Sequence, residues 1–83
     1  MQKWEYMVVR AYGGVVMLVN GVEVAQMVDM LPVGEMLYEF LGDKGEDGWE
    51  VVGMAGVREG TELVLKRPLV ELDDEDEDSE PEE

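Results

Sequence analysis

The side chains that most enzymes use for catalysis are almost absent from this 83-residue chain. It contains no histidine and no cysteine, and Thr61 and Ser79 are its only threonine and serine. Histidine, cysteine and serine supply most catalytic bases and nucleophiles, and cysteine and histidine are the usual ligands of zinc. We therefore predict that the chain is not an enzyme and that it holds no metal and no cofactor.

Glutamates on predicted strands are the remaining candidates for acid and base chemistry. Two carboxylates that flank a sugar linkage can hydrolyse it, as in glycosidases. Strand side chains alternate between two faces, however, and a charged one is normally solvated or paired. We predict that role, rather than catalysis, for Glu5, Glu23, Glu50 and Glu62.

Three glycines spaced three residues apart stand among carboxylates in residues 42 to 48. A phosphate-binding glycine loop precedes a helix, whose free N–H groups face the anion. This segment follows a predicted helix, so its free carbonyls and carboxylates would repel phosphate. It also lacks the alternating acidic positions and final glutamate of an EF-hand calcium loop. We predict a loop that ends the helix, with Gly45 or Gly48 as the left-handed cap.

Most of the formal net charge of −15 lies at one end of the chain. Residues 1 to 70 hold 11 acidic and 6 basic side chains, whereas residues 71 to 83 hold 10 acidic and no basic ones. The acidic segment has too few apolar side chains to offset the roughly 1 to 2 kcal/mol per residue that ordering costs. We predict a single α+β domain over residues 1 to 70 and a disordered acidic tail over residues 71 to 83.

Three roles fit this acidic tail. Its charge could keep a small protein soluble, or it could reflect adaptation to high salt. It could instead attract a basic protein partner, or compete with nucleic acid for a basic groove. The tail residues that would contact such a partner are Asp73, Asp74, Glu75, Asp76, Glu77 and Asp78.

Alternating apolar residues predict strands. Residues 4 to 12 are rich in aromatic and β-branched side chains and end at two glycines, which is typical of a strand and a turn. Residues 15 to 24 predict a hairpin, because Asn20 and Gly21 tolerate the positive φ angles of a type I′ turn. Its register places one row of side chains on the same side: Val15, Met17, Val19, Val22 and Val24.

A helix is predicted to begin at Pro32, after a connection over residues 27 to 32, because proline suits the first helical turn. Its buried stripe is Val33, Met36, Leu37, Phe40 and Leu41. Residues 49 to 57 and 61 to 67 predict two more strands. The order strand, strand, strand, helix, strand, strand indicates an α+β fold, in which one helix packs on one face of an antiparallel sheet of four to five strands.

Short motifs occur at the start, middle and end of the predicted domain: Lys3-Trp4-Glu5-Tyr6, Gly48-Trp49-Glu50 and Leu65-Lys66-Arg67-Pro68. Together they resemble the small bacterial domains catalogued as domain of unknown function 4177. The resemblance implies a compact domain of helix and sheet and no known chemistry. The Asn20-Gly21 hairpin and Lys44 depart from the family pattern, and the acidic tail lies outside it.

The tryptophan motif has a structural interpretation. We expect Gly48 to reverse the chain and Trp49 to lie in the core beneath the helix, because a small core needs the area that an aromatic ring buries. Glu50 is expected to face solvent or to pair with Lys66 or Arg67 on the neighbouring strand.

A domain of this size seldom gains more than about 3 to 5 kcal/mol from its core, and this chain has no disulfide or metal to add. We therefore expect a homo-oligomer, formed through hairpin surfaces or sheet edges. The leading functional hypothesis is a non-enzymatic, self-associating interaction module whose polyanionic tail meets a basic protein. The alternative is a small-ligand-binding or sensor domain with a pocket between helix and sheet.

Charge and hydropathy exclude two other classes of partner. The negative charge opposes binding to nucleic acid phosphates and to anionic lipids. Val15 to Val19 is the longest apolar run, far short of the roughly 18 residues that span a bilayer. The N-terminus also lacks the apolar segment of a signal peptide. We expect a cytoplasmic protein that binds neither nucleic acid nor membrane.

Overall fold

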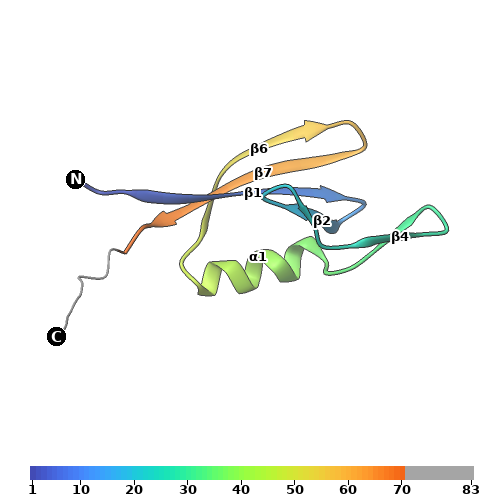
Figure 1. Cartoon of the computed structure of the whole chain (residues 1–83), viewed down its shortest axis with the longest axis horizontal. Helices are drawn as coiled ribbons and strands as arrows, with labels where there is room; N and C mark the ends of the chain where they lie inside the picture. Colours follow the sequence, from blue (N-terminus) through green and yellow to red (C-terminus); the bar gives the residue numbers. More distant parts are fainter. Residues whose placement is uncertain (71–83) are drawn as a thin grey trace.

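The computed structural model describes residues 1–70, which form one helix and two antiparallel sheets. In chain order the elements are β1 (Trp4–Tyr12), β2 (Val15–Val19), β3 (Val22–Glu23), β4 (Gln26–Val28), β5 (Leu31–Val33), α1 (Leu37–Glu46), β6 (Glu50–Val57) and β7 (Gly60–Pro68). The main sheet has the order β3-β2-β1-β7-β6, and β4 pairs with β5 in a small second sheet. Helix α1 lies on one face of the main sheet (Figure 1). The predicted α+β fold is confirmed.

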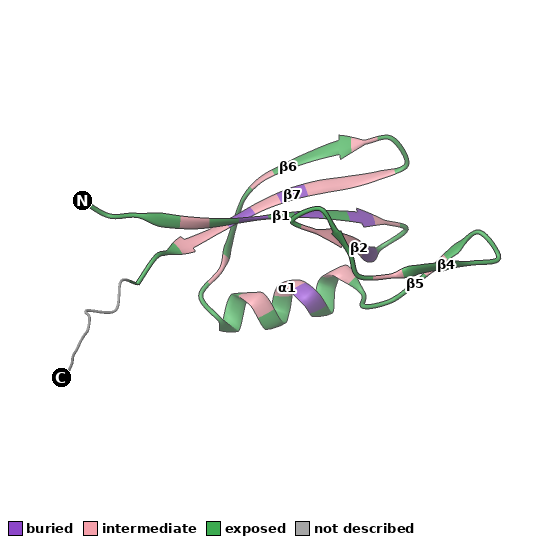
Figure 2. Cartoon of the chain, in the orientation of Figure 1, coloured by how far each residue is buried: buried purple, intermediate pink, exposed green. Residues whose placement is uncertain are grey.

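The core lies between α1 and the central strands of the sheet. On β1, buried and exposed residues alternate, so that Met7 and Val9 face the helix. On β7, Leu63 and Leu65 do the same, as predicted. Phe40 enters this cluster from α1, and Val16 enters it from β2, as the buried segments in Figure 2 show.

The predicted Asn20-Gly21 hairpin is confirmed, but one of its faces differs from the prediction. Both turn residues have positive φ, 52° and 82°, and Val19 pairs with Val22. Against β1, however, Leu18 lies opposite Arg10 while Val16 lies opposite Ala11, so Met17 is an extra residue in β2. A bulge of this kind reverses the alternation of faces. Val16 therefore enters the core in place of Met17.

The helix begins five residues later than predicted. Residues 27 to 33 are not a connection and a first helical turn, because Gln26–Val28 and Leu31–Val33 pair as an antiparallel hairpin. Asp29 and Met30 form its turn with φ angles of 52° and 66°, values that glycine usually supplies. Of the predicted stripe, Leu37, Phe40 and Leu41 pack on the core, whereas Val33 is exposed and Met36 precedes the helix.

Backbone hydrogen bonds fix both ends of α1. At its start, the N–H of Leu37 donates to the carbonyl of Gly14 at 2.7 Å. At its end, Gly48 adopts a φ of 92°, and the N–H of Trp49 donates to the carbonyl of Lys44 at 2.9 Å, which is a Schellman motif. The predicted left-handed cap is therefore Gly48, while residues 42 to 46 belong to the helix rather than to a loop.

Candidate functional site

Three of the four strand glutamates lie opposite basic residues. Glu5 faces Arg67, Glu50 faces Lys66 and Glu62 faces Arg10 in the strand register. Glu62 and Arg10 form an ion pair at 3.6 Å. Glu23, the fourth glutamate, lies opposite Leu18 on β2. In the strand pairs of residues 1–70, none of these four carboxylates therefore lies directly opposite another.

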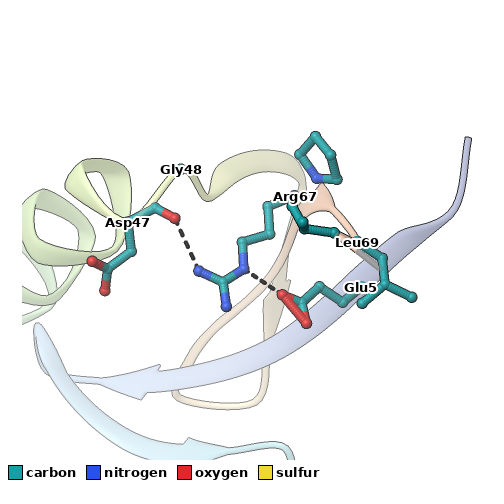
Figure 3. A pocket seen from close by; sticks show the side chains of 7 residues that line it. Glu5, Asp47, Gly48, Arg67 and Leu69 are labelled. Carbon is teal, nitrogen blue, oxygen red and sulfur yellow. Dashed lines mark hydrogen bonds and ion pairs between the residues drawn. The ribbon is translucent and has the colours of Figure 1, made fainter. Parts of the chain in front are cut away.

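One basic side chain joins three elements at one end of the sheet. The Arg67 Nε group on β7 pairs with the Glu5 carboxylate on β1, and Arg67 Nη1 donates to the carbonyl of Asp47 at 2.9 Å (Figure 3). Its guanidinium carbon lies 4.5 Å from the centre of the Trp49 ring. We call Arg67, Glu5, Asp47 and Trp49 the Arg67 cluster. It ties the end of α1 to the two central strands.

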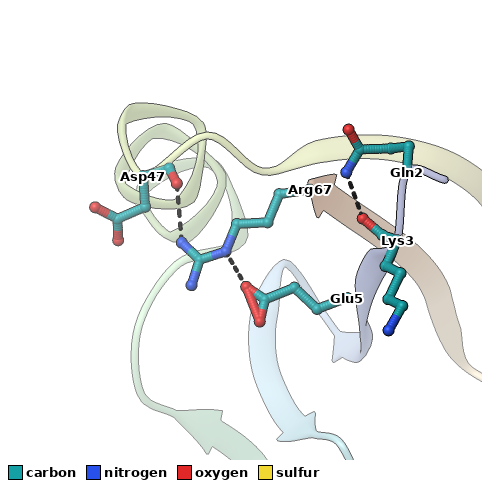
Figure 4. A network of polar contacts seen from close by, with 5 residues as sticks. All are labelled: Gln2, Lys3, Glu5, Asp47 and Arg67. Atoms are coloured by element: carbon teal, nitrogen blue, oxygen red, sulfur yellow. Dashed lines mark hydrogen bonds and ion pairs between the residues drawn. The ribbon is translucent and has the colours of Figure 1, made fainter. Parts of the chain in front are cut away.

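Three members of the Arg67 cluster, Glu5, Asp47 and Arg67, line an open cleft. The cleft has a volume of about 540 Å³ and includes Pro68, Leu69 and Val70, the last described residues. Nearby, the Gln2 side-chain amide donates to the carbonyl of Lys3 (Figure 4). Because the Arg67 guanidinium already contacts a carboxylate, a carbonyl and a ring, the geometry gives it a structural role. Trp49 is half-buried against the core, close to its predicted position.

Removing the guanidinium should loosen this junction. We expect Arg67→Met to lower the free energy of unfolding by about 1 to 2 kcal/mol, because it removes a stacking contact and two charge-assisted hydrogen bonds, one of them to a half-exposed carboxylate. Urea unfolding followed by tryptophan fluorescence measures the loss. Arg67→Lys is the matched control, since it keeps the charge but not the planar group, and it should recover only part of the stability. Full recovery by lysine would show that charge alone matters.

The face of the sheet opposite α1 carries exposed aromatic and apolar side chains. Trp4, Tyr6 and Val8 of β1 alternate with the buried residues and are at least partly exposed. Lys66 of β7 lies above Trp4, with its Nζ 3.9 Å from the ring centre. A cation over an aromatic face is attracted to it, so the lysine covers part of this ring. The remainder of this face stays open to solvent.

Two further apolar surfaces lie at the periphery. The hairpin of β4 and β5, which we call the arm, extends away from the body (Figure 1). An isolated two-stranded hairpin is marginally stable in water. The edge strand β6 likewise exposes Val51, Val52 and Met54. The exposed apolar residues of the arm are Met27, Val28, Met30, Leu31 and Val33.

Within residues 1–70, side chains fill the interface between the middle of α1 and the sheet, and the cleft beside Arg67 lies where the end of α1 meets β1 and β7. The space between α1 and the sheet is occupied by Phe40 and flanked by Leu37 and Leu41. Within residues 1–70, no group of three or more acidic side chains could hold a metal ion. No helix in this part of the chain is long and apolar enough to cross a membrane. The predicted partner-contacting residues, Asp73 to Asp78, lie outside the described residues.

Comparisons with known proteins found no relative of this chain. No family model, no curated protein and no solved structure matches the chain. The resemblance to domain of unknown function 4177 therefore stays a prediction based on the motifs at the start, middle and end of the domain.

Proposed function

We propose that this chain is a non-enzymatic interaction module that self-associates in the cytoplasm and presents its acidic segment to a basic protein partner. The observation that supports self-association is the apolar surface that α1 leaves uncovered. It lies on the open face of the sheet, on the arm and on β6. Exposed apolar side chains that gather on the same element mark surfaces where proteins associate.

The charge distribution supports the second half of the proposal. The chain carries 21 acidic and 6 basic side chains, and 10 of the acidic ones lie in residues 71 to 83. A dense block of like charge raises the association rate with an oppositely charged protein and makes the complex sensitive to salt. The partner class that fits is therefore a protein with a basic surface.

Sedimentation equilibrium of the full chain tests self-association. We expect the average mass to rise above the monomer mass of 9.3 kDa as the concentration rises through the micromolar range. A folded species that keeps the monomer mass over that range would refute this half of the proposal. Circular dichroism on the same samples shows whether the protein is folded.

Co-purification from the native host at low salt tests the partner. The informative variant replaces the acidic residues 73 to 78 with asparagine and glutamine, and the control carries the same acidic residues in shuffled order. We expect the neutralised variant to lose a basic protein that both the original and the shuffled chain retain. An unchanged set of bound proteins would contradict the partner assignment.

A further inference from the structure

The two edges of the main sheet differ in length and in protection. At one edge, β3 has two residues, and one of them is the exposed Glu23. At the other edge, β6 has eight residues, and in the described part of the chain its only partner strand is β7. An edge strand of that length presents a row of backbone N–H and C=O groups to any strand that reaches it. The edge at β6 is therefore the open one.

Beyond Glu50, its first residue, the open edge also lacks the charges that normally block strand addition. Residues 51 to 57 contain no charged side chain and no proline, in a chain with a net charge of −15. Two copies of such a chain repel each other, and an uncharged strip is where they approach at least cost. A bulge at Val52 interrupts the pairing with β7, so the regular part of the edge runs from residue 53 to residue 57.

Side chains of β6 extend the hydrophobic face beyond the helix. Val51 lies opposite Leu65 and Met54 lies opposite Leu63, so both point to the face that α1 covers. Both β7 partners are buried, whereas Val51 is 43% and Met54 is 72% exposed. Figure 1 shows the reason, because α1 lies beneath β1 and β2 and does not reach β6. Within residues 1–70, no segment covers this part of the face.

We propose that β6 pairs antiparallel with β6 of a second copy of this chain, about a twofold axis perpendicular to the sheet. The inference rests on the proposed self-association and assigns it to one surface. The pairing joins two five-stranded sheets into a continuous ten-stranded sheet and satisfies both open edges. Antiparallel twofold symmetry places both α1 helices on the same face, so Val51 and Met54 of the two copies meet in the strip between them.

A glutamate at the strand edge tests this pairing in the full-length protein. Met54→Glu places two like charges near the twofold axis, and we expect it to raise the dimer dissociation constant at least about tenfold in sedimentation equilibrium. Met30→Glu at the tip of the arm is the matched control. It makes the same chemical change at a residue that is 85% exposed. It should leave the dissociation constant within about twofold.

The outcomes separate the two proposals. If Met54→Glu leaves the dimer intact, or if Met30→Glu weakens the dimer equally, the β6 pairing is wrong. Neither result contradicts self-association itself. A folded monomer in the original chain would refute both. Because the chain has no cysteine, Met54→Cys gives an independent measurement: a short bis-maleimide should join two copies of that variant, and Met30→Cys should stay unlinked. Equal cross-linking of the two variants would also contradict the pairing.

Discussion

Replacing Gly60 with alanine is expected to destabilise the domain by about 2 kcal/mol or more. Gly60 begins β7 where this strand passes the end of β1, and a methyl group there would overlap the carbonyl oxygen of Ala11. The carbonyl carbon of Ala11 and the Cα of Tyr12 would lie only 3.4 Å and 3.7 Å away. These atoms belong to the backbone of a central strand, so they cannot move without breaking the pairing of β1 with β7.

Urea unfolding measures this effect as a lower transition midpoint with an unchanged slope. Gly42→Ala is the control for the general effect of replacing a glycine. A methyl group at Gly42 meets no atom within 4 Å, and alanine is favoured over glycine in a helix by about 1 kcal/mol. The two variants should therefore shift the midpoint in opposite directions. Equal midpoints would show that β1 and β7 separate at Gly60 without cost.

Phe40→Ala should destabilise the domain by about 3 to 5 kcal/mol, which is comparable with the entire stability expected of a domain this small. Phe40 is the one buried residue of α1 and contacts the core formed by β1, β2 and β7. The helix has ten residues, includes two glycines and begins without a side-chain cap, so it depends on this contact. Loss of the ring should release α1 from the sheet.

Circular dichroism at 222 nm and near-ultraviolet dichroism of the tryptophans follow this change. Tyr38→Ala is the matched control, because it removes an aromatic ring from the same helix at a position that is 71% exposed. Its effect should stay within about 0.5 kcal/mol. If both variants lost similar stability, Phe40 would not be the residue that anchors α1.

Local signals predicted the elements whose structure is decided locally. The strand over residues 4 to 12 and the turn at Asn20 and Gly21 follow from side-chain alternation and from turn chemistry, and both are confirmed. The arm was missed because Asp29 and Met30 turn the chain with positive φ in the absence of glycine. Pro32 and the helical spacing after it then indicated an early helix.

Features that depend on pairing between segments far apart in the chain could not be predicted from the sequence. Val16 replaces Met17 in the core because of the register between β1 and β2, which no property of β2 alone determines. The partner of Arg67 is likewise decided by the alignment of β1 with β7. Glu50 was considered for Arg67, but Glu5, which is 62 positions away in the chain, occupies that place.

The position of β1 and β7 side by side in the sheet also affects when the domain can fold during its synthesis. β1 is the first strand of the domain to leave the ribosome and β7 is the last, yet each is the other's neighbour. Until residues 60 to 68 emerge, the nascent chain exposes one long side of β1 and cannot close its core. The β1–β7 pairing of this domain therefore closes only after nearly all of the domain has been translated, and long-range pairing of this kind slows folding.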